Sequence, residues 1–347
     1  MVRAVVVGAT GYTGAELVRL LLGHPGVELA GLVGHSTAGE PVSAVLPSLA
    51  GIVSGTVAPF DARAIAEQAD AAFCALPHGA SADKVGALRE AGLVVFDLSA
   101  DFRLRSLDTY RQWYGEHGAP ERLAEAVYGL PELYREALRT ADLVAVPGCY
   151  PTSAILPLAP LLREGLVELD QPIVVDAKSG VSGAGRPPKP RTHYPETAES
   201  LRAYSIAGRH RHTPEIEQEL SAAAGREVRV VFSPHLVPMT RGILSTIYLR
   251  PRAGVDAGRC TEAARGLYEG SPSVHVLAPN ECPDTLRVRG SNRAHLSYTS
   301  DERSGWIVAQ AAIDNLVKGA AGQAVQCMNV RFGFDEGAGL GQPALWP

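Results

Sequence analysis

A single cysteine stands in the segment Val-Pro-Gly-Cys-Tyr-Pro-Thr, residues 146–152, where an apolar run gives way to a helix-forming run. A cysteine at such a strand-to-helix junction lies at the positive end of the helix dipole, which stabilises the reactive thiolate. The N–H groups of the same helix end can also hold the oxyanion of a carbonyl under attack. A small buried hydrophobe is the ordinary role of a cysteine, but this setting predicts that Cys149 is a nucleophile.

The other four cysteines have no comparable setting, and packing explains them; they are Cys74, Cys260, Cys282 and Cys327. The total is odd and no C-x-x-C pair occurs, which argues against a disulfide framework and against a structural zinc site. Free thiols favour the reducing cytoplasm, so we expect a cytoplasmic protein without a bound metal.

Near the start of the chain, the strand-like run Arg-Ala-Val-Val-Val is followed by Gly-Ala-Thr-Gly-Tyr-Thr-Gly. Gly8, Gly11 and Gly14 are spaced by three residues at the point where a helix begins. Glycines let the backbone approach a pyrophosphate closely, and the helix N-terminus supplies N–H groups and positive charge. Similar turns also serve plain packing, but this placement in a strand–helix–strand unit predicts dinucleotide binding.

The end of the second strand indicates which dinucleotide. A site for NAD usually carries an acidic residue there to hold the ribose hydroxyls. This strand ends in Leu-Val-Gly-His-Ser-Thr, where Ser36 and Thr37 are neutral donors and the first acid is Glu40. Because no carboxylate repels a 2′-phosphate, the sequence favours NADP.

A nucleophilic cysteine beside a nicotinamide suits an acyl group held as a thioester, and this chemistry needs a group that moves a proton. Histidine fits neutral pH best, and two histidines lie in Gly-Arg-His-Arg-His-Thr-Pro-Glu-Ile, residues 208–216. Thr213 is predicted to cap a helix, with the histidines in an extended entry that turns His210 and His212 to one side. Geometry leaves the two equal, and solvated loop histidines are the alternative.

Two further segments follow predicted strands and could bind anions. Ser99 and Arg103, in Asp-Leu-Ser-Ala-Asp-Phe-Arg, come just beyond the carboxyl end of a parallel strand, where ligands gather in such sheets. Residues 179–186 form a second glycine-rich turn. This turn either floors the nicotinamide pocket or only turns a corner.

The elements that must position these residues fall into two patterns. Short apolar runs alternate with helices up to Gly148, which predicts a parallel sheet covered on both faces. After a buried helix that ends at about Arg163, longer strands (227–237 and 241–250) and one helix (256–268) predict a mixed sheet. Residues 313–332 are predicted to form a long helix against the first domain. The Pro-rich, basic segment 185–196 is interpreted as an ordered surface loop or flap.

The predicted fold class is therefore α/β: an N-terminal Rossmann-type doubly wound sheet plus an α+β catalytic domain with a mixed sheet. A length of 347 residues favours two domains. We place an NADP-binding domain at 1–148 with 313–347, and a catalytic and dimerisation domain at 149–312.

The composition excludes several functional classes. A net charge of -5 gives no footprint for nucleic acid or for an anionic membrane. The first residues are not typical of a signal peptide, and no apolar stretch is long enough to cross a bilayer. The expected partner is a small-molecule substrate.

Seven segments resemble, in order, the N-acetyl-gamma-glutamyl-phosphate reductase family, related to aspartate-semialdehyde dehydrogenase: GATGYTG, DLSADFR, VPGCYPT, KSGVSGAGR, HRHTPEI, RGIL and IDNLVKGAAGQAVQ. The resemblance spans nearly the whole chain. It implies NADPH-dependent reduction of N-acetyl-gamma-glutamyl phosphate to the semialdehyde with release of phosphate, through a cysteine thioester, in arginine biosynthesis. A homodimer or homotetramer is expected.

The resemblance also implies roles for single residues. Cys149 resembles the family nucleophile and His210 its acid/base, while Arg103 matches a phosphate-binding position. The expected substrate-binding residues are Arg103, Ser99, Arg211 and His212. The expected cofactor-binding residues are Gly8, Thr10, Gly11, Tyr12, Thr13, Gly14, Ser36, Thr37, Pro77, Ser179, Gly180 and Asn315.

Two alternatives stay open. The related reductase of lysine biosynthesis acts on an aminoadipyl phosphate attached to a carrier protein, and the form Gly-Cys-Tyr-Pro-Thr favours the arginine enzyme over it. A non-catalytic NADP-binding sensor with the same fold would have no reason to pair Cys149 with the histidines.

Overall fold

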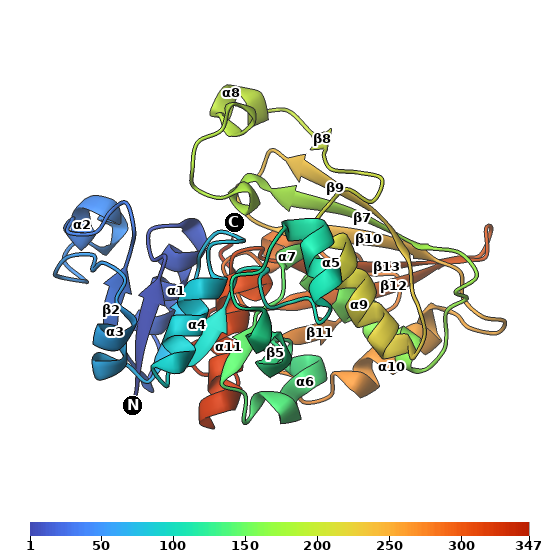
Figure 1. Cartoon of the computed structure of the whole chain (residues 1–347). Helices are drawn as coiled ribbons and strands as arrows, with labels where there is room; N and C mark the ends of the chain where they lie inside the picture. Colours follow the sequence, from blue (N-terminus) through green and yellow to red (C-terminus); the bar gives the residue numbers. More distant parts are fainter. Residues whose placement is uncertain (347) are drawn as a thin grey trace. The chain divides into compact units, whose positions relative to one another are not determined.

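The structure is a computed structural model that describes residues 1–346. The chain forms two compact units, coloured along the sequence in Figure 1. The first unit contains residues 1–147 and takes up the chain again at Ala320, as far as Gly341. The second unit runs from Gly148 to Gly319 and includes the segment that starts at Gln342. The first unit is therefore built from both halves of the chain.

The first unit holds a six-stranded sheet in which every pairing is parallel, with the strand order β2-β1-β3-β4-β6-β5. Its strands are β1 (Val2–Val7), β2 (Val27–Val33), β3 (Ala71–Cys74), β4 (Val94–Asp97), β5 (Ala126–Tyr128) and β6 (Leu143–Ala145). Its helices are α1 (Tyr12–Leu22), α2 (Val42–Val45), α3 (Ala62–Gln68), α4 (Ala82–Glu90), α5 (Leu107–Tyr114), α6 (Pro131–Leu138) and α11 (Gly322–Phe332). The predicted doubly wound parallel sheet is confirmed.

The strands are short and almost wholly buried because helices cover both faces of the sheet. Val5 and Val7 of β1 pack with Ile65 of α3 and with Val85 and Leu88 of α4. On the other side α1 packs against β1 and β2, and α11 packs against α1, α6 and β4. From β1 the chain passes to β2 on one side and then crosses to β3 on the other side of β1. The carboxyl ends of β1 and β3 therefore form the switch point of the sheet, where sheets of this kind bind ligands.

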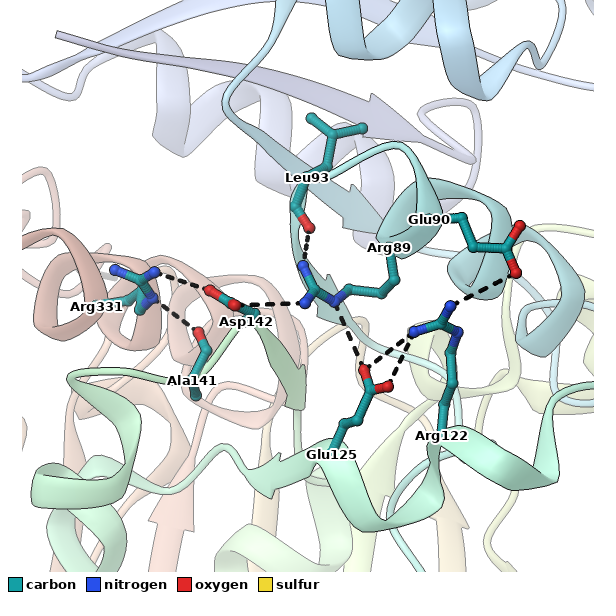
Figure 2. A network of polar contacts seen from close by, with 8 residues as sticks. All are labelled: Arg89, Glu90, Leu93, Arg122, Glu125, Ala141, Asp142 and Arg331. Carbon is teal, nitrogen blue, oxygen red and sulfur yellow. Dashed lines mark hydrogen bonds and ion pairs between the residues drawn. The ribbon is translucent and has the colours of Figure 1, made fainter.

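A network of charged side chains fastens α11 within the first unit (Figure 2). Asp142, just before β6, accepts hydrogen bonds from Arg331 of α11 at 2.8 Å and from Arg89 of α4 at 3.3 Å. Arg89 also pairs with Glu125, which binds Arg122 at 2.9 Å. These hydrogen bonds hold the pKa of the Asp142 carboxyl below its usual value. Single exposed ion pairs contribute little, but this chain of pairs joins segments far apart in sequence.

The second unit holds a seven-stranded mixed sheet of order β11-β12-β13-β10-β7-β9-β8, as the predicted α+β domain requires. Its strands are β7 (Ile173–Gly180), β8 (Arg202–Ala203), β9 (Val230–Val237), β10 (Ile243–Leu249), β11 (Val274–Val276), β12 (Ala294–Asp301) and β13 (Trp306–Ile313). Its helices are α7 (Cys149–Arg163), α8 (Tyr194–Thr197), α9 (Thr213–Ala224) and α10 (Ala257–Leu267).

One face of this sheet packs on α7, with α9 and α10 beside it (Figure 1). Because α7 is apolar almost all round, nearly its whole surface is buried. The opposite face of the sheet presents large side chains to solvent, including Val231, 46% exposed, and Tyr248, 38% exposed. The Pro-rich segment 185–196 forms short turns and α8, with mostly exposed side chains.

Two local predictions are wrong. The helix expected over 313–332 begins later, because β13 runs to Ile313 and a π-turn (Val317–Ala321) precedes α11. The Asp314 carboxylate accepts the N–H groups of Leu316 and Val317 and so ends the strand in a turn. The cap of α9 is His212 in a helical conformation, and the Thr213 hydroxyl makes no hydrogen bond to the described residues.

Candidate active site

The glycine-rich loop of the first unit is packed as closely as its residues allow. Gly8 has a φ of 83°, and a Cβ atom there would lie 2.4 Å from the carbonyl oxygen of Ala75, just beyond β3. A Cβ atom at Gly14 would lie 2.3 Å from the carbonyl oxygen of Gly8. Gly11 caps α1 without a side-chain hydrogen bond, and the first turn of α1 has no acidic residue. The loop therefore presents an uncapped helix end at the switch point.

The tip of β2 carries the neutral residues expected from the sequence. Ser36 is exposed, and Thr37 is half-buried against Gly34. The Thr37 Oγ1 atom is buried and has no hydrogen-bond partner within residues 1–346. A buried hydroxyl of this kind costs free energy unless a ligand or water satisfies it. The tip thus offers a donor that protein atoms leave unused.

Ser99 and Arg103 lie beyond β4 in the first unit, as predicted, and both are buried. The Arg103 guanidinium donates to the carbonyl oxygens of Val146 and Leu98, both at 2.7 Å. The Ser99 hydroxyl donates to the Asp97 carboxylate at 2.6 Å. Burial raises the pKa of Asp97 to about 6, although the hydroxyl groups of Ser99 and Ser81 both donate to its carboxylate. By its two hydrogen bonds Arg103 joins the segments that follow β4 and β6, the second of which leads to residue 149.

Pro77, beyond β3, is exposed.

Cys149 is the first residue of α7, so the predicted strand-to-helix junction is confirmed. The preceding Gly148 is extended and caps the helix without a side chain, and no acid lies in the first turn. The Gly148 N–H donates to the buried carboxylate of Glu215 at 2.9 Å. Cys149 and Tyr150 occupy the first two helical positions, whose N–H groups have no acceptor within the helix. The thiol is half-buried.

The two candidate histidines lie together, but not in an extended segment. Their ring centroids are 4.9 Å apart, and the centroid of Tyr150 lies 5.6 Å from His210 and 6.0 Å from His212. The backbone N–H of His212 donates to Nδ1 of His210 at 3.1 Å, within a turn. Because Nδ1 accepts this bond, a neutral His210 carries its proton on Nε2. Arg211, between them, is exposed.

A chain of hydroxyl groups borders the histidines. The Tyr204 hydroxyl, from the loop after β8, donates to the Tyr150 hydroxyl at 3.1 Å, which in turn donates to the carbonyl oxygen of His235 at 3.2 Å. Burial raises the pKa of Tyr204 to about 12 and raises that of Tyr150 still further. Both phenols therefore stay protonated and act as fixed donors.

Ser179, Gly180 and Asn315 meet at one edge of the mixed sheet. Ile243 pairs with Ser179 on one side and with Ile313 on the other. The Asn315 amide accepts from the Gly242 N–H at 2.8 Å and donates to the Ser182 hydroxyl at 3.0 Å. Cys149 lies at the same edge, because it contacts Gly319 in the segment after Asn315.

The second unit thus contains Cys149, His210, Arg211, His212, Ser179, Gly180 and Asn315, while the remaining candidates belong to the first unit. Sequence reasoning missed the roles of Tyr204, Glu215 and Gly319. Glu215 was visible only as a first-turn acid, and no pattern marks the other two.

Neither a metal cluster nor a membrane-spanning helix occurs within residues 1–346. No three His, Cys, Asp or Glu side chains in this range gather as a metal site. None of its helices has the length and apolar character needed to span a membrane.

Comparison with known proteins defines the class first. Residues 3–141 match the family model "Semialdehyde dehydrogenase, NAD binding domain", and residues 149–315 match "Semialdehyde dehydrogenase, dimerisation domain". Aspartate semialdehyde dehydrogenase II from Vibrio cholerae has the same fold, with a TM-score of 0.71 at 19% identity over 95% of this chain and 98% of that one. The enzyme from Candida albicans, solved with NADP, also reaches 0.71 at 18% identity, covering 95% and 98%. The chain is an oxidoreductase with a nicotinamide-cofactor domain.

Curated relatives give the family. The N-acetyl-gamma-glutamyl-phosphate reductase of Magnetococcus marinus is 49% identical over 99% of both chains, and that of Moorella thermoacetica is 51% identical over 100% of both. The chain belongs to the N-acetyl-gamma-glutamyl-phosphate reductase family, as the seven motifs predicted.

Proposed function

We propose that the protein reduces N-acetyl-gamma-glutamyl phosphate to N-acetylglutamate semialdehyde with NADPH, releasing phosphate, as a step of arginine biosynthesis. One observation carries the proposal: Cys149 begins the uncapped helix α7 directly beside the ring of Tyr150, against which His210 and His212 pack. A cysteine at a helix N-terminus, with two imidazoles packed on the next residue of that helix, suits acyl transfer.

The proposed reaction has two stages. The Cys149 sulfur bonds to the acyl carbon, the carbon–oxygen bond to phosphate breaks, and the phosphate leaves with the one proton that the net reaction consumes. A bound reduced nicotinamide supplies the hydride that the thioester carbon accepts. The N–H groups of Cys149 and Tyr150 hold the oxyanion in both stages. The carbon–sulfur bond then breaks, and aldehyde and thiolate separate.

The hydrogen bonding of His210 supports a donor role. Because Nδ1 accepts the His212 N–H, the neutral ring presents Nε2–H as a hydrogen-bond donor to a substrate oxygen. A neutral imidazole does not release this proton, so the ring delivers a proton only from its imidazolium form. Protonation of the ring would require this hydrogen bond to break, since both nitrogens would then be donors. On the family resemblance we assign the proton transfer to His210 and substrate contact to His212 and Arg211.

The first unit fits NADP in particular. The glycine loop and the end of α1 would hold the pyrophosphate, through residues Gly8, Thr10, Gly11, Tyr12, Thr13 and Gly14. Ser36 and the unused Thr37 hydroxyl would hold the 2′-phosphate, where no acid opposes it. Ser179, Gly180 and Asn315 are proposed on resemblance to line the nicotinamide, and Pro77 is proposed to bind the cofactor.

Arg103 and Ser99 are proposed, on resemblance, to bind the phosphate of the substrate. The observed bonds of Arg103 to two carbonyl oxygens give it a supporting task as well. Arg103→Lys separates the two, because a lysine cannot reproduce bidentate binding. An increase in KM for the acyl phosphate at unchanged melting temperature and NADPH affinity indicates phosphate binding. A lower melting temperature with unchanged KM indicates support alone.

The direct test is turnover in reverse with N-acetylglutamate semialdehyde, phosphate and NADP. We expect NADPH formation that depends on phosphate and is absent from Cys149→Ser. Activity only with a carrier-linked aminoadipate semialdehyde would assign the lysine reaction. NADP binding without any turnover would instead indicate the non-catalytic NADP-binding sensor.

We also propose a homodimer formed through the open face of the mixed sheet. Val231 and Tyr248 lie exposed on that face, and exposed apolar sheet faces of this kind mark interfaces. Val231→Glu should dissociate the assembly, as measured by light scattering during size exclusion. A mass of four chains in the wild type would indicate a homotetramer. An unchanged mass in the variant would move the interface elsewhere.

The compartment proposed for this reaction is the cytoplasm. The five described cysteines are thiols, and three of them are buried, as a reducing environment permits. Fractionation of expressing cells, followed by detection of the protein, tests this assignment.

A further inference from the structure

The segment between β13 and α11 is held rigidly at the site edge. The fully buried carboxylate of Asp314 accepts the N–H groups of Leu316 at 2.8 Å, Val317 at 3.1 Å and Gly290 at 2.7 Å. Asn315 is held by hydrogen bonds at both ends of its amide. Such a segment has little freedom to move away from a neighbour.

This segment places the backbone of Gly319 against Cys149. The Gly319 N–H donates to the carbonyl oxygen of Asp314 at 2.9 Å, which closes the turn. A Cβ atom at Gly319 would lie 2.8 Å from the Cβ atom of Cys149 and 3.2 Å from its Cα atom. Carbon atoms at van der Waals contact are about 3.5–4.0 Å apart, so no side chain fits without displacing Cys149 or the turn.

The requirement for glycine here is spatial rather than conformational. Gly319 is not among the glycines with positive φ, so an alanine could adopt its backbone angles. The atoms it would meet are Cβ and Cα of Cys149 and, at 3.3 Å, the carbonyl oxygen of Asp314, and no change of rotamer can move any of them. The missing side chain therefore fixes the place of the nucleophile.

We propose that Gly319 is a positioning residue for Cys149, with Asp314 as the anchor that holds it there. This inference rests on the proposed role of Cys149 as the nucleophile. A displacement of about 1 Å at a reacting atom costs roughly 10²-fold in rate. Gly319 thereby sets the line along which the sulfur meets the acyl carbon.

The test compares Gly319→Ala with Gly266→Ala, a glycine of α10 whose added Cβ would meet no atom within 4 Å. Both are made in a Cys282→Ser background, because Cys282 is exposed and would react with alkylating reagents. We expect Gly319→Ala to lower kcat by about 10²-fold, with KM and NADPH affinity within about twofold. The rate of Cys149 carboxamidomethylation by iodoacetamide, located by mass spectrometry, should change, and Gly266→Ala should change neither rate.

Alkylation reports on the thiol without turnover, so it separates two failures. A changed alkylation rate in a protein that never reduces the acyl phosphate would overturn the proposed function and leave the positioning role. Unchanged kcat and alkylation in a folded Gly319→Ala protein would overturn the positioning role alone. If that variant does not fold, Asp314→Asn is measured in the same way, and an unchanged alkylation rate there, or its failure to fold, also overturns the proposal.

Discussion

The helices α1 and α7 begin in the same way, although they lie in different units. Gly11 and Gly148 cap them in extended conformations, with φ and ψ of -77° and 168° in one and -69° and 155° in the other. Neither helix has a side-chain cap or an acid in its first turn. The helices α3, α5 and α10 instead have Asp61, Ser106 and Asp256, whose side chains accept N–H groups of the first turn.

The two uncapped ends differ in the residues around the cap. The loop before α1 has glycines at Gly8, Gly11 and Gly14, so its backbone is free of side chains there, as the proposed binding of a cofactor pyrophosphate requires. The first residue of α7 is a cysteine, and the proposed function requires its sulfur to react as a thiolate. The comparison teaches that one arrangement, a positive helix end without a competing cap, suits both roles proposed here: to bind an anion at α1 and to stabilise one at α7.

The largest effect should come from the sulfur of α7. Cys149→Ser should fold and bind NADP but lose turnover by several orders of magnitude, because an alcohol at this position is not ionised. Steady-state rates measure the turnover, and the melting temperature with and without NADP measures folding and NADP binding. An acyl adduct on the wild-type thiol, trapped by mass spectrometry, would support the comparison, and substantial residual activity in the serine variant would break it.

The next effect should come from the imidazole beside α7. His210→Asn should lower kcat by about 10²–10⁴-fold and flatten the pH–rate profile near neutrality, since the variant loses the proton donor. His212→Asn is the matched control and should act mainly through KM. The opposite pattern would transfer the proton role to His212.

A smaller effect is expected near the other helix end. Ser36→Asp should weaken NADPH binding by about 1–3 kcal/mol, because a carboxylate there repels the 2′-phosphate. NADH binding should hardly change, which provides the control within one variant. Equal efficiency of NADPH and NADH in the wild type would show that the tip of β2 does not read the 2′-phosphate.

The smallest effect concerns the glycines themselves. Gly8→Ala should lower the free energy of unfolding by at least about 1–2 kcal/mol, because an L-residue is strained at positive φ. Gly11→Ala is the control, since its Cβ atom would lie 3.8 Å from the nearest atom. Denaturant titration measures both. Equal stability of the two variants would mean that the loop relaxes and that close packing does not shape this helix end.

The parts of the fold with strong local signals were predictable from the sequence. The run ending at Gly8, the helix after it and the helix that starts at Cys149 all have continuous apolar patterns, and the structure contains them. The strand β5 was missed, because three residues give no period to detect. The strands β12 and β13 were not named, although Gly290-Ser291-Asn292 before Ala294 and Asp314-Asn315 after Ile313 are turn signals.

The remaining errors arise where a side chain overrides a pattern. The apolar run after Ile313 has the composition of a helix, yet the Asp314 carboxylate captures the next N–H groups and bends the chain. The same sequence reasoning assigned the cap of α9 to Thr213, whereas the turn closed by His210 and His212 shifts the start by one residue. These hydrogen bonds between side chains and backbone N–H groups cannot be predicted from the spacing of apolar residues.

The return of α11 to the first unit has a consequence for synthesis of the chain. While a ribosome makes the protein, residues 1–147 emerge without the helix that packs on α1, α6 and β4. The second unit, which is nearly contiguous in sequence, can fold before the first is complete. The first unit is complete only when α11 has been made and Arg331 has formed its hydrogen bond with Asp142. A chain cut short before residue 320 would thus retain Cys149 but leave an apolar face for chaperones and proteases to recognise.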